Sequence, residues 1–374
     1  MENKVLIAMS GGVDSSVAAA LLNFKGYECA GATMKLYSNE DICMDLQKTC
    51  CSADDVFDAR SVAARLNIPF YVFNFKEDFG KEVIERFIHA YECGMTPNPC
   101  IDCNRYMKFE KLYNKAMLLG YDYVATGHYA RVEYDEGKGR YLLKKGFDAS
   151  KDQSYVLYSL TQEQLSHTLF PLGEFTKAQI REMAEKHGFI NANKRDSQDI
   201  CFVPDGNYAG FIRQYTGKDY PEGNFVTKDG KILGKHKGII HYTIGQRKGL
   251  SLSLKEPAYV CEKKMDTNEV VLGKNEDLFS SRLTADNFNW ISVGSPKESI
   301  RVTAKTRYSQ KEQPAMAHAL SSGRVEVIFD EPVRAITQGQ AVVLYDGDTV
   351  VGGGTIIGVR KSGFKFNSFC FHHF

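Results

Sequence analysis

The stretch MSGGVDSS, residues 9–16, lies between a short apolar run and a pattern typical of a helix. A glycine-rich turn between a strand and a helix aims backbone N–H groups and the positive end of the helix dipole at one point, which suits an anion. The common nucleoside-triphosphate loop, G-x-x-x-x-G-K-[ST], adds a lysine that reaches the terminal phosphates. Residues 9–16 contain no lysine. They therefore predict a phosphate-binding loop of a different kind, and the bland alternative is a plain strand–turn–helix corner.

The side chains of this stretch favour pyrophosphate together with a metal ion. The hydroxyls of Ser10, Ser15 and Ser16 are donors for phosphate oxygens. Asp14 would repel phosphate unless a magnesium ion lay between them, so Asp14 is a candidate Mg²⁺ ligand. We therefore expect ATP to be cleaved between its α- and β-phosphates, which releases pyrophosphate and leaves an adenylate.

Three cysteines form the second group of residues with chemical potential. Cys100 and Cys103 stand in the Pro-rich stretch TPNPCIDCNRYMKF, residues 96–109, which we expect to be a loop, and Cys201 stands in KRDSQDICF, residues 194–202. An isolated C-x-x-C is a redox pair, half of a zinc site or a chance spacing. A zinc site would need a second pair, and the sequence contains no clear one.

At an adenylating site, two separated cysteines have a specific use. One carries a persulfide, whose outer sulfur attacks the activated carbon, and the other breaks the S–S bond to release a thiocarbonyl. The thiolate is the reactive form of cysteine, and nearby positive charge lowers a thiol pKa. Arg105, Lys194 and Arg195 are the basic neighbours in the sequence, so we expect them to favour thiolates at Cys103 and Cys201.

Alternating strands and helices must position these residues. Apolar runs predict strands at 4–9, 27–37, 70–75 and 121–129, and helical patterns stand at 15–26, 52–67, 76–94, 105–120, 154–169 and 176–189. Such alternation predicts an α/β fold with a doubly wound parallel sheet, as in nucleotide-binding domains. Beyond about residue 205 the sequence changes to β-rich segments punctuated by glycine. We expect a catalytic domain over 1–205, a small β-rich central domain over 206–285 and a C-terminal β-barrel over 286–374.

Composition describes an ordinary globular protein. Of the 374 residues, 43% are apolar and 25% are charged, and no run approaches the roughly 20 apolar residues of a membrane helix. The N-terminus lacks a signal-peptide cleavage site, so we expect a cytoplasmic protein with no membrane partner. The net charge is only +1, so a nucleic acid would have to meet local basic patches such as 228–248, a stretch that is otherwise a solvated face.

Ten cysteines are too few for a disulfide scaffold in a chain of this length. In a reducing compartment they are catalytic, metal-binding or buried. We expect Cys50 and Cys51 to be packing residues, and the terminal FCFHHF, residues 369–374, to be a buried strand more readily than a metal site.

Six motifs, taken in order, resemble those of the tRNA-specific 2-thiouridylase family within the ATP pyrophosphatase-loop superfamily. They are MSGGVDSS, TPNPCIDCNRYMKF, ATGHYAR, KDQSYVLYSL, KRDSQDICFVPDG and YTIGQRKGL. The resemblance implies a sulfurtransferase that uses ATP and takes sulfur from a donor such as a cysteine desulfurase or a sulfur-relay protein. It implies that C2 of the wobble uridine is adenylated and its oxygen replaced by sulfur, in tRNAs with Lys, Glu and Gln type anticodons, giving 2-thiouridine, AMP and pyrophosphate.

Carried over residue by residue, the resemblance gives roles to individual side chains. It implies that Cys201 carries the persulfide, that Cys103 is the partner nucleophile, and that the two form a disulfide at the end of each cycle. It also implies that the C-terminal barrel binds tRNA. The implied ATP positions are Ala8, Met9, Ser10, Gly11, Gly12, Val13, Asp14, Ser15, Met34 and Gly127; the target-base positions are Asn98, Pro99 and Cys100; and the tRNA contacts are His128, Lys151, Asp152, Gln153, Arg307, Tyr308 and Gln338.

The chain departs from part of the family at one position. Some relatives carry Asp where this chain has Cys100, so the proton-handling role given to that Asp has no residue here. Cys100, Cys103 and Cys201 could instead hold a [4Fe–4S] cluster with an open position for sulfide, which is the alternative to a persulfide relay. Two other functions stay open: an ATP-dependent amide or amidine ligase acting on a small metabolite, and a non-catalytic RNA-binding or redox adaptor.

Overall fold

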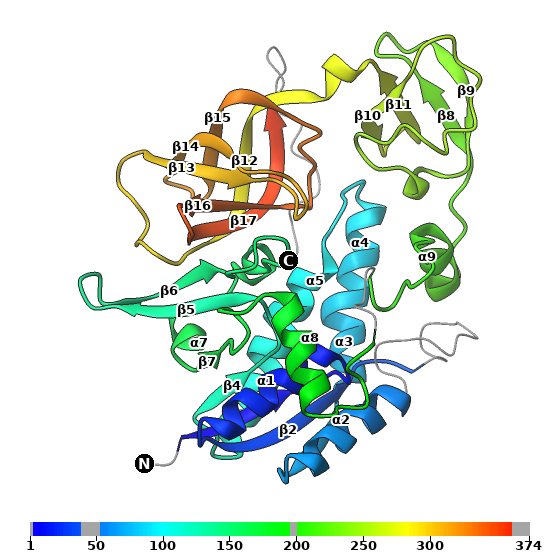
Figure 1. The fold of residues 1–374 in the computed structure, drawn as a ribbon. Coiled ribbons are helices and arrows are strands. Elements are labelled where there is room, and N and C mark those ends of the chain that lie inside the picture. The colour runs from blue at the N-terminus through cyan, green and yellow to red at the C-terminus, as the bar shows by residue number, and fades with distance from the viewer. Residues whose placement is uncertain (1–2, 39–52, 195–199, 361–374) are drawn as a thin grey trace.

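The computed structural model describes residues 3–38, 53–194 and 200–360 (Figure 1). The expectations for Cys50, Cys51, Arg195 and residues 369–374 therefore lie outside the described residues. Within the described ranges, no helix is both long and apolar enough to cross a membrane.

The first domain contains the expected parallel sheet, in the order β3-β2-β1-β4-β7. All four pairings in it are parallel. The strands are β1 (Lys4–Ala8), β2 (Glu28–Lys35), β3 (Phe70–Asn74), β4 (Tyr123–Ala125) and β7 (Thr168–Leu169). Val5 and Ile7 of β1 pack against one apolar cluster and Leu6 against another, so both faces of the sheet are covered. This confirms the doubly wound arrangement.

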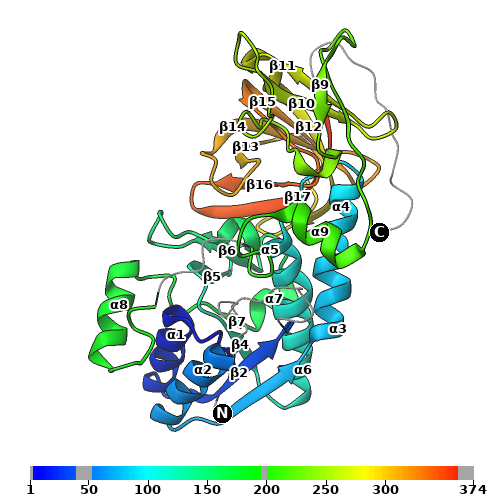
Figure 2. The same cartoon turned by 90° about the vertical axis from the view of Figure 1, so that its right-hand side faces the viewer.

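Helices cover the two faces of this sheet (Figure 2). The helices α1 (Val13–Phe24), α2 (Ala53–Arg65) and α8 (Lys177–Lys186) lie on one face. The other face is covered by a long helix made of α5 (Pro99–Asp102), the π-helical η2 (Cys103–Leu112) and α6 (Tyr113–Leu118). A second composite helix joins α3 (Lys76–Phe79), the π-helical η1 (Gly80–Glu85) and α4 (Arg86–Glu92).

Two helix predictions were wrong in their bounds. The helix predicted from residue 105 begins at Pro99, because Asn98 caps it: the Asn98 Oδ1 accepts a hydrogen bond from the backbone N of Cys100 at 3.1 Å, and proline suits the first helical position. The helix predicted over 154–169 is instead the 3₁₀ turn η3 (Ser154–Leu157), the short α7 (Gln162–Ser166) and β7. Thr161 forms a capping box with Gln164, which starts a new helix there.

The middle of the chain forms a smaller β-rich unit. It begins with α9 (Tyr208–Thr216) and contains a sheet in the order β10-β11-β8-β9. The strands are β8 (Gly223–Val226), β9 (Ile232–His236), β10 (Tyr259–Lys264) and β11 (Glu269–Gly273), with the 3₁₀ turn η4 (Ile239–His241) between β9 and β10.

The C-terminal strands close into a barrel, as predicted. The ring runs β12-β15-β14-β13-β16-β17, and β17 pairs back with β12. The strands are β12 (Phe279–Trp290), β13 (Ile300–Lys305), β14 (Gln313–Ala319), β15 (Val325–Arg334), β16 (Ala341–Asp346) and β17 (Thr349–Arg360), and the 3₁₀ turn η5 (Asn275–Leu278) leads into β12. Strand β12 runs across positions 285 and 286, where the sequence suggested a domain boundary.

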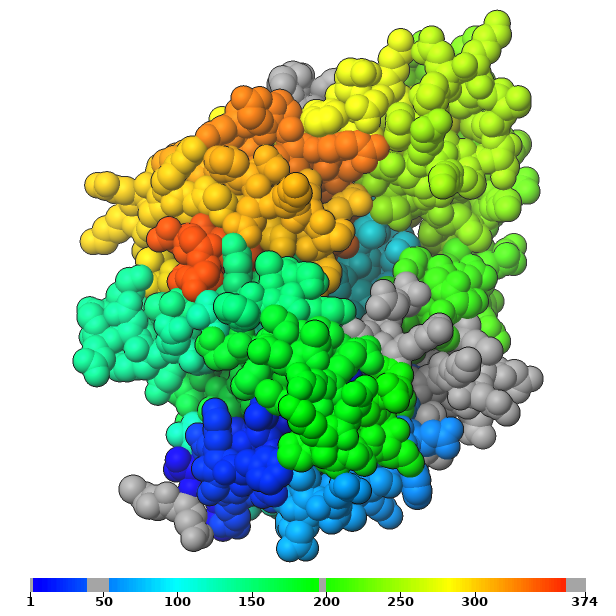
Figure 3. All heavy atoms as spheres, in the orientation of Figure 1, coloured from blue at the N-terminus to red at the C-terminus, as the bar shows by residue number. Residues whose placement is uncertain are grey.

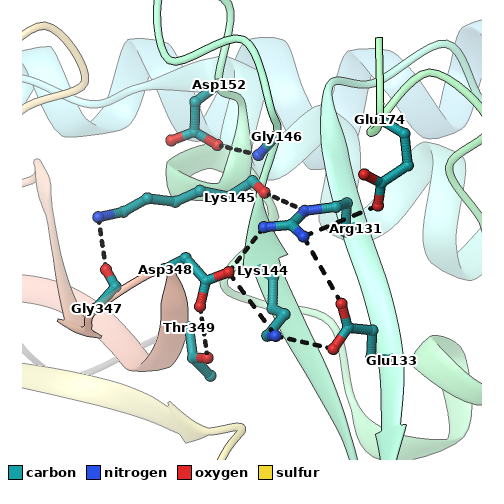
Figure 4. A network of polar contacts seen from close by, with 10 residues as sticks. All are labelled: Arg131, Glu133, Lys144, Lys145, Gly146, Asp152, Glu174, Gly347, Asp348 and Thr349. Atoms are coloured by element: carbon teal, nitrogen blue, oxygen red, sulfur yellow. Dashed lines mark hydrogen bonds and ion pairs between the residues drawn. The ribbon is translucent and has the colours of Figure 1, made fainter.

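A hairpin of the first domain reaches the barrel. Its strands β5 (Ala130–Asp135) and β6 (Arg140–Lys145) extend the barrel sheet, since Lys144 pairs with Thr349 of β17. Arg131 donates to Asp348 at 2.7 Å in the turn between β16 and β17, and Lys145 donates to the backbone O of Gly347 at 2.8 Å (Figure 4). In the space-filling view the barrel rests directly on this hairpin (Figure 3). The hairpin therefore couples the parallel-sheet domain to the barrel.

Candidate active site

The loop after β1 requires glycine and closes on itself. Gly11 has a φ of +73°, and a Cβ there would lie 2.4 Å from the backbone O of Asp55, so no other residue fits without displacing α2. The backbone N of Ser10 donates to Ser15 Oγ at 3.2 Å, and that hydroxyl donates to the backbone O of Gly12 at 3.0 Å. The chain thus forms a compact turn over the N-terminus of α1, as the sequence predicts for an anion loop.

Ser16 has a structural role instead of the predicted phosphate contact. Its side chain is fully buried and donates to the backbone O of Gly12 at 3.1 Å. The same hydroxyl accepts from Asn191 Nδ2 at 2.9 Å, and this amide also donates to the backbone O of Gly11 at 2.9 Å. Ser16 therefore stabilises the loop from its buried side.

The other expected ATP positions meet at the carboxyl edge of the sheet. The backbone N of Met9 donates to the backbone O of Ala32 at 2.8 Å, which joins the loop to β2 two residues before Met34. A Cβ on Gly127 would lie 2.8 Å from the backbone N of Ser15, so the end of β4 lies against the first turn of α1. The carboxyl ends of β1, β2 and β4 are where open parallel sheets bind ligands.

Asp14 is engaged by protein groups. Lys177 Nζ donates to both carboxylate oxygens of Asp14, at 2.8 Å each, and the Tyr129 hydroxyl donates to Oδ1 at 2.8 Å. A cation bound to this carboxylate would lie beside the ammonium of Lys177 and would be repelled by it. Asp14 does not fit the role of a Mg²⁺ ligand in this arrangement.

Two lysines that the loop motif lacks come from distant segments. Besides Lys177, Lys194 Nζ lies 3.3 Å from the backbone O of Gly11, and it forms ion pairs with Asp55 at 2.6 Å and Asp58 at 2.7 Å. The sequence reasoning missed Lys177 altogether and assigned Lys194 to the cysteines. Only the folded sheet brings these residues to the loop, because they follow it by more than 160 positions.

Cys103 and Cys201 pack against the same apolar cluster. Both are partly exposed, and they border this cluster together with Met34 and Tyr106. The Tyr37 hydroxyl donates to the backbone O of Cys201 at 2.9 Å. Cys103 is the first residue of η2, immediately after the turn that carries Cys100. Both cysteines of the predicted pair therefore border one cluster.

The expected activation of Cys103 by nearby positive charge was wrong. Burial raises the pKa of the Cys103 thiol, and the opposing effect of Lys108 is smaller. The guanidinium of Arg105 lies 5.8 Å from the ring centroid of Tyr106 and 5.9 Å from that of Tyr158. Lys194 is held by Asp55 and Asp58, as described above. Desolvation of the thiolate therefore outweighs the cations at Cys103.

The residues do not fit an iron–sulfur cluster in this arrangement. Across the described ranges, which include Cys100, Cys103 and Cys201, no three His, Cys, Asp or Glu side chains gather as metal ligands would. Cys100 is exposed and lies near Tyr308 of the barrel. Burial, together with the charges of Asp152 and Cys100, raises the pKa of the Tyr308 hydroxyl.

The segment that leads into the expected target-base positions is hydrogen-bonded to the barrel. The backbone N of Thr96 donates to the backbone O of Gln338 at 2.9 Å, and Gln340 Nε2 donates to the backbone O of Thr96 at 2.8 Å. The Tyr308 hydroxyl donates to the backbone O of Asp152 at 3.1 Å. Segment 96–100 and the expected tRNA positions 152, 308 and 338 are therefore brought together from different domains.

Other expected tRNA positions face inward. His128 is only 7% exposed; its ring nitrogens lie 2.6 Å from Thr126 Oγ1 and 3.3 Å from Lys108 Nζ, and burial holds its pKa well below the usual value. Arg307 donates to the backbone O of Ile244 and Ala335, each at 3.1 Å.

In the KDQ motif, residues 151–153, the side chains of Asp152 and Gln153 also accept hydrogen bonds from within the protein. Asp152 accepts from the backbone N of Gly146 and of Ser154, and Gln153 accepts from the backbone N of Tyr129. Of these three residues, Lys151 carries the cation suited to a phosphate contact.

Family models match three successive parts of the chain. One described as tRNA methyl transferase HUP domain matches residues 3–205, the tRNA methyl transferase PRC-barrel domain matches 209–274, and the aminomethyltransferase beta-barrel domain matches 280–356. A 4-thiouridine synthetase–RNA complex with bound ATP is 18% identical, covers 57% of this chain and 50% of that chain, and has a TM-score of 0.33, a likeness too distant to bear on function.

Curated relatives match almost from end to end. The tRNA-specific 2-thiouridylase of Clostridioides difficile is 53% identical over 356 residues, which cover 95% of this chain and 98% of the relative. That of Acetivibrio thermocellus is 54% identical over 356 residues, covering 95% and 99%. The chain belongs to the tRNA-specific 2-thiouridylase family.

Proposed function

We propose that this protein is an ATP-dependent tRNA 2-thiouridylase, a sulfurtransferase that exchanges O2 of the wobble uridine for sulfur. The observation that carries the proposal is the match, over 95% of the chain and nearly the whole length of each relative, to proteins named for this activity. An anion loop, two cysteines that border one apolar cluster, and a barrel that is hydrogen-bonded to segment 96–100 agree with it.

In the proposed reaction, ATP binds with its phosphates at the loop 9–16. The uridine O2 attacks the α-phosphate, which releases pyrophosphate and leaves the C2 oxygen as an adenylate. The outer sulfur of a persulfide on Cys201 then attacks C2, and AMP leaves with the oxygen. The Cys103 thiolate attacks the inner sulfur, so a Cys103–Cys201 disulfide forms and the thiocarbonyl stays on the base. A reductant of the thiol class restores both thiols before the next cycle.

Several partners follow from this proposal. The substrates are tRNAs with Lys, Glu and Gln type anticodons, and sulfur arrives from a cysteine desulfurase or a relay protein. Magnesium enters on the phosphates of ATP, without Asp14 as a ligand. We place the reaction in the cytoplasm, where tRNA is abundant and thiols are kept reduced.

We also propose a division of labour along the chain. Residues 1–205 would form the catalytic domain, 206–285 the central domain and 286–374 the tRNA-binding barrel. The family matches at 3–205, 209–274 and 280–356 support this division, with the last boundary moved to the start of β12 so that the strand is not split.

The proposal is tested by incubating purified protein with tRNA, ATP, magnesium and a cysteine desulfurase with cysteine, under air and anaerobically. Mass spectrometry of the nucleosides should find 2-thiouridine, and AMP and pyrophosphate should appear in step with it. The family descriptions suggest methyl transfer as a second function, which would add a methyl group to a nucleoside only when S-adenosylmethionine is present. Release of ADP and phosphate, or a methylated nucleoside, would contradict the proposal.

The relay and the iron–sulfur mechanism assign different work to Cys100. In the relay it lies beside the base without reacting, so Cys100→Ser should keep most of the activity in air, whereas Cys103→Ser and Cys201→Ser should each be inactive. A peptide containing Cys201 should gain the mass of one sulfur atom after loading. If Cys100→Ser is inactive and anaerobic protein contains about four iron and four sulfide per chain, the relay is wrong.

A further inference from the structure

Lys177 lies at the anion loop because helix α8 begins there. Thr176 caps α8 with a capping box to Gln179, and the backbone N of Lys177 donates to Asp148 Oδ2 at 3.0 Å. The starting point of the helix is therefore fixed by two independent contacts. Its first side chain extends to Asp14 in the first turn of α1 and is only 11% exposed. Ordering this long side chain costs entropy during folding, and that cost is then absent when a ligand binds.

The contacts of Lys177 differ from those of the second lysine at the loop. Lys194 is neutralised by two carboxylates, Asp55 and Asp58. Lys177 donates to both oxygens of the Asp14 carboxylate, which also accepts from the hydroxyl of Tyr129. A lysine ammonium can contact a carboxylate and a phosphate oxygen together, because its N–H donors point in different directions. Without Lys177, the Asp14 carboxylate would meet the triphosphate as an uncompensated negative charge.

We propose that Lys177 supplies the positive charge that the loop 9–16 lacks, and that its ammonium, oriented by Asp14 and Tyr129, contacts the β- and γ-phosphates of ATP. This rests on the proposed function. Attack at the α-phosphate places negative charge on the departing pyrophosphate. A cation preoriented beside that group stabilises the transition state without reorganisation. Asp14 is then a positioning residue, since it acts through Lys177.

The first experiment measures equilibrium binding, which does not require turnover. Affinities for α,β-methylene-ATP and for AMP are compared in the wild type, Lys177→Met and Lys177→Arg. Loss of one charge-assisted hydrogen bond predicts that Lys177→Met binds the triphosphate analogue about 10- to 100-fold more weakly. Binding of AMP should change little, and Lys177→Arg should recover part of the affinity. Equal weakening for both ligands, or none, would overturn the proposal.

The matched control is Lys186→Met on the same helix. Lys186 is exposed and pairs with Glu182 at 2.6 Å, so this variant removes a lysine from α8 without touching the loop. Because Lys177→Met leaves the Asp14 charge unpaired, the double variant Asp14→Asn/Lys177→Met keeps the test valid if the single variant unfolds. The double variant should fold and still bind the triphosphate analogue weakly; wild-type affinity in it would contradict the role of Lys177.

The second experiment measures pyrophosphate release in a single turnover with tRNA and saturating ATP. Lys177→Met should slow release by about 100-fold, as for removal of one transition-state donor, with tRNA affinity unchanged. The magnesium concentration for half-maximal rate should be the same in Asp14→Asn as in the wild type; a large increase would return Asp14 to the metal. If the wild type makes no 2-thiouridine but the binding result holds, the proposed function fails while the role of Lys177 stands.

Discussion

Cys103 combines a reactive position with an environment that suppresses its reactivity. Burial raises its pKa, so at neutral pH less of it is thiolate than of an ordinary cysteine. Below its raised pKa the Cys103 thiol is mostly protonated. Its reactivity should therefore keep rising with pH beyond the range where the reactivity of an ordinary thiol has levelled off. A thiol of this kind resists chance oxidation until substrate or a persulfide lies beside it.

The first prediction follows from that shift. The rate of alkylation of Cys103 by iodoacetamide, followed by peptide mass spectrometry between pH 7 and 10, should be lower than that of glutathione at neutral pH and should level off at higher pH. Exposed Cys100 serves as the internal control and should react faster. Faster alkylation of Cys103 than of glutathione at neutral pH would show that Lys108 outweighs burial.

At the scale of residues, the sequence predicted the groups better than their surroundings. The turn at 9–16 and its glycines could be predicted because the motif is local in the sequence, whereas the pairing of Cys103 with Cys201 stays a prediction. Lys177, Tyr129 and Asn191 could not be found this way, because only the order of strands in the sheet brings them to Asp14 and Ser16. The pKa of Cys103 was also beyond the sequence, since desolvation depends on packing.

Among the elements, strand β5 begins beside both the anion loop and the KDQ segment, residues 151–153. The side chain of Tyr129 donates to Asp14, while its backbone N donates to Gln153 Oε1 at 3.0 Å and its backbone O accepts from the backbone N of Gln153 at 2.9 Å. One residue therefore contacts both the loop and the KDQ segment. A change at Asp14 on ATP binding has a direct route to Gln153.

This contact predicts that Tyr129→Phe uncouples the two ligands. In the wild type we expect α,β-methylene-ATP to tighten tRNA binding, and by linkage tRNA to tighten binding of the analogue equally. Losing one hydrogen bond to a carboxylate, worth about 1.5–3 kcal/mol, should reduce that mutual effect while tRNA affinity without nucleotide stays the same. Tyr134→Phe, an exposed position in β5, is the control. Undiminished coupling in Tyr129→Phe would rule out this route.

Arg307 joins elements of two domains through a partly buried guanidinium. It donates to Ile244 in the central domain, and to Ala335 and Thr337 after β15, the last at 2.7 Å. Arg307→Lys keeps the charge but loses the planar fork that reaches these acceptors. We expect the variant to lose about 1–3 kcal/mol of stability in denaturant titrations, with the salt dependence of tRNA binding unchanged.

The exposed pair of Arg301 and Asp330 provides the comparison, because Arg301→Lys should cost little. If Arg307→Lys instead leaves stability intact and weakens tRNA binding, Arg307 contacts RNA directly.

Element types were predicted more reliably than element ends. The alternation of apolar runs and helical patterns was enough for the parallel sheet, and regular strand segments with glycine turns were enough for the barrel. The start of the helix at Pro99 was missed because its proline was taken as a loop signal, although Asn98-Pro99 is also a helix start. The C-x-x-C therefore lies in a helical turn, and its Ile101 packs in one cluster with Ala341 and Val343 of the barrel.

For the whole molecule, a net charge of +1 means that tRNA must be attracted locally. The charges of the hairpin network in Figure 4 are paired: Arg131 with Asp348, and Lys144 with Glu133 at 2.8 Å. The pair of Arg131 and Asp348 joins the hairpin to the turn between β16 and β17 of the barrel. Since their charges are compensated, they contribute little to the release of counterions that drives RNA binding.

The last prediction concerns Lys151, the cation of the KDQ segment. If it contacts a phosphate, Lys151→Ala should weaken binding of every tRNA by a similar factor and reduce the slope of log K against log salt by about 1. Fluorescence anisotropy with labelled tRNA at several salt concentrations measures both. Lys138→Ala is the matched control, because Lys138 lies at the tip of the hairpin and pairs with Asp135 at 3.8 Å. The charged pairs between the hairpin and the barrel are intact in both variants. An equal loss of slope in the two variants would therefore mean that the hairpin tip also contacts RNA. An unchanged slope in Lys151→Ala would exclude the KDQ segment from the phosphate contacts.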